Sequence, residues 1–223
     1  MTVINNKHKF IFVHVPKNAG TSITNLLASF STPIDIEIGG TQMGELLQPE
    51  YIKRYGISKH STSFALETVL GEVWNNYFKF AIVRNPFSRF ISAYNFLRKW
   101  NSGNINFHNK ILSFNDINDF ISSNFISLET PDNIFNKQTY WLYDKFNERM
   151  MIDKYIKIEE IDNGIRTLAQ NIPAMVNYES GILPRSNSSS NSEKNFNEIL
   201  TKNSLDILYT VYRDDFDRFN YNN

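Results

Sequence analysis

The chain has 223 residues, with 23 Lys and Arg against 23 Asp and Glu, so its formal net charge at pH 7 is zero. This length suits one domain with a sizeable core, and we expect a single domain over residues 1–223. The balanced charge argues against a general nucleic-acid-binding protein but allows a local basic pocket. The chain contains no Cys, which excludes disulfides and thiol chemistry.

The first predicted strand leads directly into a candidate binding loop. Residues 10–23 read FIFVHVPKNAGTSI, which predicts a strand over 10–15, a turn, and a helix over 20–30. In such a turn Gly20 allows a close backbone approach, and the first helical amides point at negative charge. Lys17 adds a cation, and Thr21 and Ser22 add hydroxyls. This segment therefore favours a phosphate-bearing ligand.

A second strand–turn–helix follows in the middle of the chain. Before it we expect a short strand near 34–38, a helix over 44–55 and a helix over 62–74. Residues 78–83 then predict a strand, and 86–100 a helix with Asn85 as its N-cap and Pro86 in its first turn. We expect Arg89 to be a structural residue, on the helix surface or in an ion pair.

The remaining elements complete an alternating pattern of strands and helices. The expected segments are a loop over 101–115, a helix over 116–125, an irregular stretch over 126–137, a strand over 153–158, a helix over 159–171, a loop over 173–192 and one or two helices over 195–219. This alternation predicts an α/β fold with a mainly parallel central sheet flanked by helices. Open sheets of this kind bind ligands at the carboxyl edge of their strands.

The binding motifs resemble those of one enzyme family. Lys17 precedes Gly20, unlike the Walker A order, and PKNAGTS resembles the 5′-phosphosulfate loop of sulfotransferases that use 3′-phosphoadenosine 5′-phosphosulfate (PAPS). Residues 78–94, FKFAIVRNPFSRFISAY, resemble the family's 3′-phosphate block, in which Arg84 and Ser92 match the phosphate-binding positions. The C-terminal LYTVYRDDFDRFNY and His60, ahead of a helix, resemble the carbohydrate-type branch, the family 2-like sulfotransferases.

The resemblance implies a P-loop-like three-layer fold and a specific reaction. PAPS would be the co-substrate, a hydroxyl on a carbohydrate the acceptor, and no metal would be needed. Asn18 stands where the family more often has Thr. Residues 186–192, SNSSSNS, are either a solvated loop or a lid over the nucleotide. The donor-binding residues carried over by the resemblance are Lys17, Asn18, Ala19, Gly20, Thr21, Ser22, Arg84, Ser92, Arg185, Asn187 and Ser189.

Two side chains are candidates for the chemical step. Lys17 would neutralise charge on the leaving oxygen, because sulfuryl transfer should resemble phosphoryl transfer with a loose in-line transition state. His60 is the candidate general base, with helix capping or a surface position as its plainer interpretation. His14, on the strand face of Phe10 and Phe12, is the rival base, although that pattern is more typical of a buried, hydrogen-bonded histidine.

Two other functions stay open at this stage. A nucleotide-dependent phosphotransferase would need a Lys after Gly20 and carboxylates for Mg²⁺ near a strand end. A non-catalytic nucleotide- or glycan-binding module would keep the loop without the base. Four aromatic residues either form a sugar-binding wall or fill the core: Trp100, Tyr140, Trp141 and Tyr143. The polar N-terminus and the lack of a membrane-length apolar run favour a cytoplasmic protein without membrane contact; the sequence leaves its oligomeric state open.

Overall fold

The computed structural model describes residues 1–100, 105–125, 134–176 and 196–222. Within it the chain forms two compact units. The sheet unit comprises Met1–Val83 and Gln138–Ser186, and the helical unit comprises Arg84–Lys137 and Asn187–Asn223. The expectation of a single domain over 1–223 stays a prediction.

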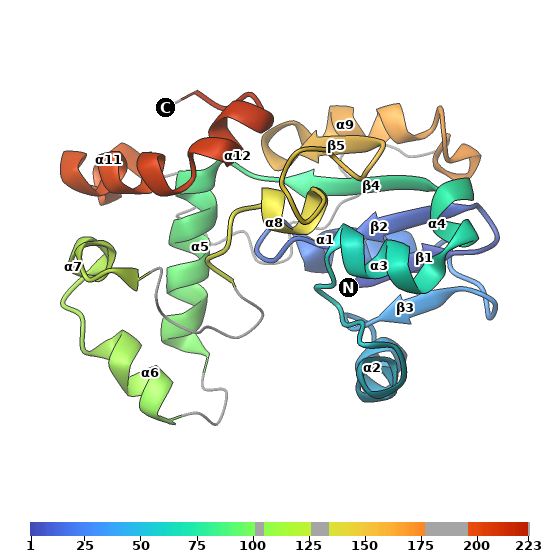
Figure 1. The fold of residues 1–223 in the computed structure, drawn as a ribbon, viewed down its shortest axis with the longest axis horizontal. Helices are drawn as coiled ribbons and strands as arrows, with labels where there is room; N and C mark the ends of the chain where they lie inside the picture. Colours follow the sequence, from blue (N-terminus) through green and yellow to red (C-terminus); the bar gives the residue numbers. More distant parts are fainter. Residues whose placement is uncertain (101–104, 126–133, 177–195, 223) are drawn as a thin grey trace. The chain divides into compact units, whose positions relative to one another are not determined.

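The sheet unit is built on five strands (Figure 1). They are β1 (Thr2–Asn5), β2 (Phe10–Val13), β3 (Ile36–Ile38), β4 (Phe78–Val83) and β5 (Lys154–Lys157), in the order β3-β1-β2-β4-β5. β2, β4 and β5 are parallel neighbours, whereas β1 is antiparallel to both β2 and β3. The sheet is therefore mixed, and the expectation of a mainly parallel sheet was too strong. Only four residues join β1 to β2, and so short a connection requires antiparallel strands.

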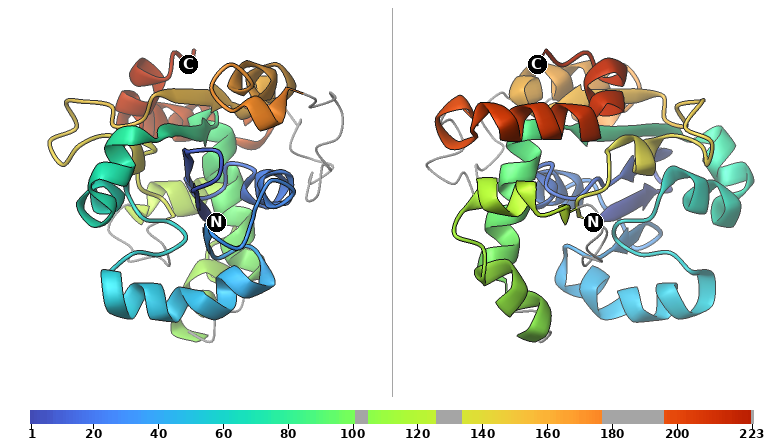
Figure 2. Two further views of the ribbon diagram at one scale, coloured as in Figure 1. Left: turned by 90° about the vertical axis from the view of Figure 1, so that its right-hand side faces the viewer. Right: turned by 60° about the vertical axis from the view of Figure 1, so that its left-hand side comes forward.

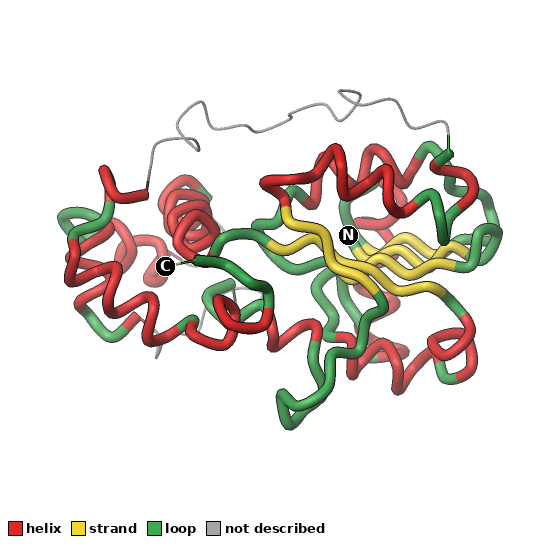
Figure 3. Tube along the Cα trace, turned by 90° about the horizontal axis from the view of Figure 1, so that it is seen from above, coloured by secondary structure: helices red, strands yellow, loops and turns green. Residues whose placement is uncertain are grey.

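Helices cover both faces of this sheet (Figure 3). α1 (Gly20–Ala28) and α9 (Ile161–Leu168) pack on one face through Ile23, Leu27 and Ile165, in one cluster with Phe12 and Phe80. On the other face lie α3 (Ser63–Leu70), α4 (Glu72–Asn76) and α8 (Thr139–Leu142), in front of the strands in Figure 1. The central strands β2 and β4 are buried on both sides, as their mostly apolar sequences favour.

Several predicted helices of the sheet unit have the expected places. α2 (Gln42–Tyr55) packs beside β3, with the Thr41 hydroxyl accepting from the Gly44 amide at 3.0 Å as its N-cap. The helix expected over 62–74 is divided into α3 and α4 at Gly71, whose φ of 53° lies in the left-handed region that glycine adopts readily. Short 3₁₀ turns, Ile158–Glu160 and Pro173–Met175, flank α9.

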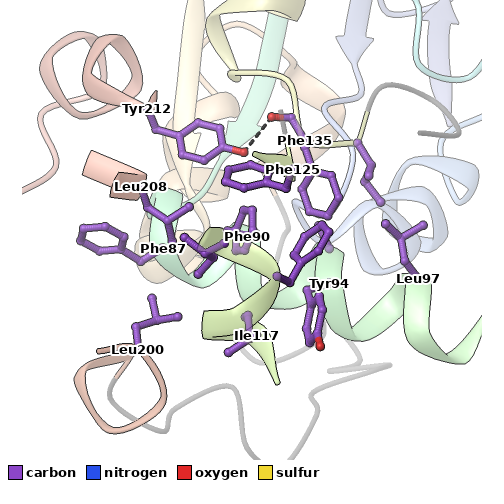
Figure 4. Packing of buried hydrophobic residues seen from close by; sticks show 14 of the residues in the cluster. Phe87, Phe90, Tyr94, Leu97, Ile117, Phe125, Phe135, Leu200, Leu208 and Tyr212 are labelled. Carbon is purple, nitrogen blue, oxygen red and sulfur yellow. Dashed lines mark hydrogen bonds between the residues drawn. The ribbon is translucent and has the colours of Figure 1, made fainter. Parts of the chain in front are cut away.

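The helical unit surrounds an aromatic core (Figure 4). Its helices are α5 (Pro86–Lys99), α6 (Ile105–Leu112), α7 (Ile117–Ser122), α10 (Phe196–Ile199), α11 (Lys202–Val211) and α12 (Arg213–Arg218). α11 crosses the first half of α5 (Figure 2), and the ring of Phe87 lies 4.8 Å from that of Phe216. Phe90 on α5 packs against Phe120 and Phe135. The prediction of a loop over 101–115 was wrong for residues 105–112, which form α6.

A search for membrane-spanning helices found no candidate among the described residues; none of their helices is both long enough and apolar enough.

Candidate functional site

The binding loop predicted from the sequence leaves the sheet at the end of β2. We call residues Pro16–Ser22 the anion loop. β2 ends at Val13 and its parallel neighbour β4 at Val83, with Val13 paired to Ala81, so both strands end at the same edge. Both strand–helix turns thus begin at the carboxyl ends of parallel strands, as the alternation of strands and helices predicts, and the structure shows that these strands are neighbours.

The anion loop holds two residues in the left-handed conformation. Lys17 has φ 70° and Ala19 has φ 55°, with Asn18 between them, and α1 begins at Gly20. Turns of this kind direct successive backbone N–H groups to one side and form concave anion sites. Ala19 is the N-cap residue, and its methyl group cannot accept a hydrogen bond from the first amides of α1. The loop thus presents a helix N-terminus and the Lys17 side chain as candidates for binding a phosphate.

Asn18 fixes the loop from the inside. Its side chain is fully buried, and Nδ2 donates to the Ile82 carbonyl oxygen at 2.8 Å and to Gln138 Oε1 at 2.7 Å. The Ile82 carbonyl can only accept, which assigns the nitrogen to that side of the amide. Among the described residues, Asn18 Oδ1 is buried without a hydrogen-bond partner. Asn18 could therefore contribute its backbone amide to a ligand, while its side chain is used within the protein.

Apart from the buried Pro16, the other residues of the loop lie nearer the surface. Lys17, Gly20 and Ser22 are half-buried, and Thr21 is exposed. Thr21 and Ser22 lie in the first turn of α1, so their hydroxyls are close to the amides that begin this helix.

The structure brings the two candidate bases together. The imidazole rings of His14 and His60 have centroids 4.5 Å apart, and His60 Nδ1 lies 3.2 Å from the His14 carbonyl oxygen. Because a carbonyl only accepts, Nδ1 carries the proton, and neutral His60 has its lone pair on Nε2. His60 is half-buried, and Thr62, not His60, caps α3. The capping interpretation of His60 is wrong.

His14 is a buried histidine, as its strand position indicated. It is 9% exposed, its ring stacks on Phe12 at 5.9 Å, and its Nδ1 lies 2.5 Å from the Met1 amino nitrogen. Burial lowers the pKa of His14 well below its usual value, and the nearby Met1 amine, His60, Lys59 and Lys17, each positive when protonated, lower that pKa further. His14 is therefore neutral near pH 7.

The two candidate phosphate-binding residues of the second block belong to the helical unit. Arg84 follows β4 directly and is half-buried, and Ser92 lies on α5, also half-buried. Asn85 is the N-cap of α5, accepting from the Phe87 amide at 3.0 Å, and Pro86 begins the helix, as predicted. Arg89 is not on the surface: it is 2% exposed.

Some expectations fall elsewhere. Arg185, Asn187, Ser189 and the proposed lid over 186–192 lie outside the described residues. Trp141 and Tyr143 are 1% and 5% exposed, so they belong to the core and not to a sugar-binding wall. Tyr140 and Trp100 are exposed, and their part in such a wall stays a prediction. Within the described ranges, no three His, Asp or Glu side chains gather as metal ligands would.

Sequence analysis missed Gln138. This residue is fully buried and contacts Asn18 across 120 positions of sequence. A single Gln before a one-turn helix has no local pattern that marks it, and only the folded chain reveals the contact.

The fold and the loop define an α/β protein with a candidate anion-binding loop between a strand and a helix. Residues 1–222 match the family model described as "Sulfotransferase family", so the chain belongs to the sulfotransferase family and is a transferase of sulfuryl groups. Neither a curated protein nor a solved structure matches it.

Proposed function

We propose that the protein transfers the sulfuryl group of PAPS to a hydroxyl group of a carbohydrate. The anion loop carries this proposal: left-handed Lys17 and Ala19 flank a buried Asn18 immediately before the N-terminus of α1. Family membership supports the sulfuryl donor, and the likeness of His60 and of residues 208–221 to the carbohydrate-type branch supports the acceptor.

Each group of the site has a role in this reaction. The loop amides and Lys17 hold the 5′-phosphosulfate. Arg84 holds the 3′-phosphate through its forked guanidinium, and Ser92 through its hydroxyl. The acceptor oxygen forms a bond to sulfur while the bond from sulfur to the bridging phosphate oxygen breaks. His60 Nε2 receives the hydroxyl proton, and adenosine 3′,5′-bisphosphate leaves with its new charge beside Lys17.

The donor half of the proposal is tested by calorimetric titration. Wild-type protein is titrated with adenosine 3′,5′-bisphosphate, 5′-AMP and Mg-ATP, and the bisphosphate is expected to bind most tightly. Arg84→Ala should weaken that binding at least about tenfold, as expected for loss of a charge-assisted contact. Arg98→Ala is the control, since Arg98 lies on α5 beside Tyr94. Preference for Mg-ATP would favour a phosphotransferase, and binding to none would favour a non-catalytic module.

The proposed carbohydrate acceptor is tested by a turnover assay. Radiolabelled PAPS is incubated with the protein and either unsulfated polysaccharides or 4-nitrophenol. Label in the polysaccharide alone supports the carbohydrate acceptor, and His60→Ala should abolish this label while keeping the affinity for the bisphosphate. Label in the phenol alone would overturn the carbohydrate assignment and leave the donor intact.

A further inference from the structure

One short helix contacts both halves of the catalytic site in the sheet unit. Gln138 at the start of α8 accepts from Asn18 Nδ2 at 2.7 Å, and Trp141 Nε1 donates to the His60 carbonyl oxygen at 3.1 Å. Residues three apart on a helix are neighbours on its surface. A single turn thus joins the anion loop to the segment that carries His60.

α8 is itself held by the segment that leads into β5. The Tyr143 amide donates to the Thr139 carbonyl at 2.9 Å, and the Met151 amide donates to the Leu142 carbonyl at 2.8 Å. Tyr143 and Met150 also form an isolated antiparallel bridge, shortly before the chain enters β5 at Lys154. With Gln138, Trp141 and Leu142 buried, α8 is held by packing as well as by hydrogen bonds.

The anion loop needs such a support. A residue with a side chain loses about 1–2 kcal/mol in the left-handed conformation, and Lys17 and Ala19 both adopt it. Strained backbone persists only when neighbouring groups fix it. Asn18, between the two, is the residue whose side chain reaches into the interior, where Ile82 and Gln138 both accept from its Nδ2. Ile82 lies on β4 and Gln138 at α8, so the loop is held between two elements.

We propose that Gln138 and Trp141 are positioning residues. Through them, α8 holds the anion loop and His60 in the relative positions that sulfuryl transfer requires. This inference rests on the proposed function for its catalytic meaning. Gln138 acts through Asn18 on the amides that bind phosphate. Trp141 acts through the main chain of His60 on the direction of its ring, which is also held at Nδ1 by the His14 carbonyl.

The first test uses hydrogen exchange in the protein without ligand. Gln138→Met keeps the volume of the side chain but removes the acceptor, and should speed exchange about tenfold in the peptide covering residues 15–23. Trp141→Phe removes the indole donor and should speed exchange in residues 57–63 instead. Unchanged exchange in both peptides would overturn the proposal, whether or not the protein is an enzyme.

The second test measures binding and turnover. Gln138→Met should weaken binding of adenosine 3′,5′-bisphosphate about tenfold, and should have no further effect when Asn18 is already Ala. Trp141→Phe should leave this affinity unchanged and lower kcat at least about tenfold, because misplacing a catalytic group costs rate. Equal effects of Gln138→Met in the wild-type and Asn18→Ala backgrounds would show that Gln138 does not act through Asn18.

Two control variants separate positioning from general destabilisation. Asn5 is a fully buried amide whose Nδ2 bonds the Phe30 carbonyl and Asp35, at the end of the β1–β2 pair opposite the anion loop. Trp74 is a buried indole on α4, under the Lys79 ammonium. Asn5→Ala and Trp74→Phe should lower Tm yet leave the exchange rates of both peptides and the affinity for the bisphosphate unchanged. Changes in exchange or affinity as large as those of the test variants would overturn the proposal. If wild-type protein binds no bisphosphate, the proposed function fails, and exchange alone decides the positioning.

Discussion

The imidazole ring of His14 occupies the space that a side chain on Gly20 would need. A Cβ atom built on Gly20 would lie 2.0 Å from His14 Nε2 and 2.4 Å from Cε1, far inside contact distance. Gly20 is helical, at the first position of α1, so its backbone conformation does not itself demand glycine. From the sequence we expected Gly20 to allow a ligand to approach the backbone closely. In the structure it is a buried histidine that lies close to Gly20.

Gly20→Ala should therefore destabilise the protein by overpacking. Forcing an extra methyl group into a packed site typically costs about 1–3 kcal/mol. Adding His14→Ala removes the ring and makes room, so the double variant should lose less free energy of unfolding than the sum of the two single variants. Urea denaturation of the four proteins measures this coupling. Strict additivity would show that the two residues do not compete for space.

Acidification should destabilise the protein through His14. Its folded-state pKa is well below the usual value, so below about pH 6.5 the unfolded chain takes up a proton that the folded protein does not bind. The free energy of unfolding should then fall as pH drops, by at most about 1.4 kcal/mol per pH unit from this group, until the folded-state pKa is reached. The measurement is urea denaturation at pH 7.5, 6.5 and 5.5.

His14→Gln is the matched comparison for this pH effect. Glutamine keeps a polar side chain without a titrating proton, so its stability should fall less between pH 7.5 and 5.5 than that of the wild type. The same loss in both proteins would assign the acid sensitivity to other groups.

Local signals predicted most of the elements that frame the site. Residues 78–83, apolar except for Lys79, define β4 at its observed bounds, and Asn85 followed by Pro86 marks the start of α5. The first strand was missed because Thr2–Asn5 is a strand only by virtue of its pairing with β2 and β3, which a short mixed sequence does not reveal.

The candidate site was predictable in its parts and not in its connections. The order PKNAGTS was enough to locate the anion loop, and His60 and His14 were both named as bases. Their mutual contact, 46 residues apart in sequence, and the contact of Asn18 with Gln138 depend on how the loops pack over the sheet. Neither hydrophobic periodicity nor capping patterns carry information about pairs so distant.

Lys17→Ala should reduce turnover far more than binding. A cation that meets charge developing on the leaving oxygen contributes in the transition state, and losing such a group costs about 10²–10³-fold in kcat. Affinity for adenosine 3′,5′-bisphosphate should fall less than about tenfold. Lys7→Ala is the control, because Lys7 is an exposed lysine of the β1–β2 turn. Loss of affinity with kcat preserved would show that Lys17 contributes equally to binding in the ground state and in the transition state.

Arg89 anchors the segment 134–136 in the helical unit. Its Nη1 donates to the Asn136 carbonyl at 2.8 Å and its Nη2 to the Ile134 carbonyl at 2.9 Å, while Tyr212 donates its hydroxyl to the Phe135 carbonyl at 2.7 Å (Figure 4). Burial lowers the pKa of Arg89, and the nearby Tyr212 and Asp215 raise it. The side chain is thus a buried cation that holds two main-chain oxygens.

Arg89→Leu should be strongly destabilising, because it removes the donors to the carbonyls of Ile134 and Asn136 and the positive charge near Asp215. Removing one partner from a buried charged cluster typically costs about 3–5 kcal/mol. Arg89→Lys should recover only part of this loss, since an ammonium cannot reproduce the two-pronged guanidinium geometry. Arg98→Leu, at a half-buried position of the same helix, should cost less than about 1 kcal/mol. Urea denaturation compares the three variants, and equal costs for Arg89→Leu and Arg98→Leu would show that the buried cation is not needed for stability.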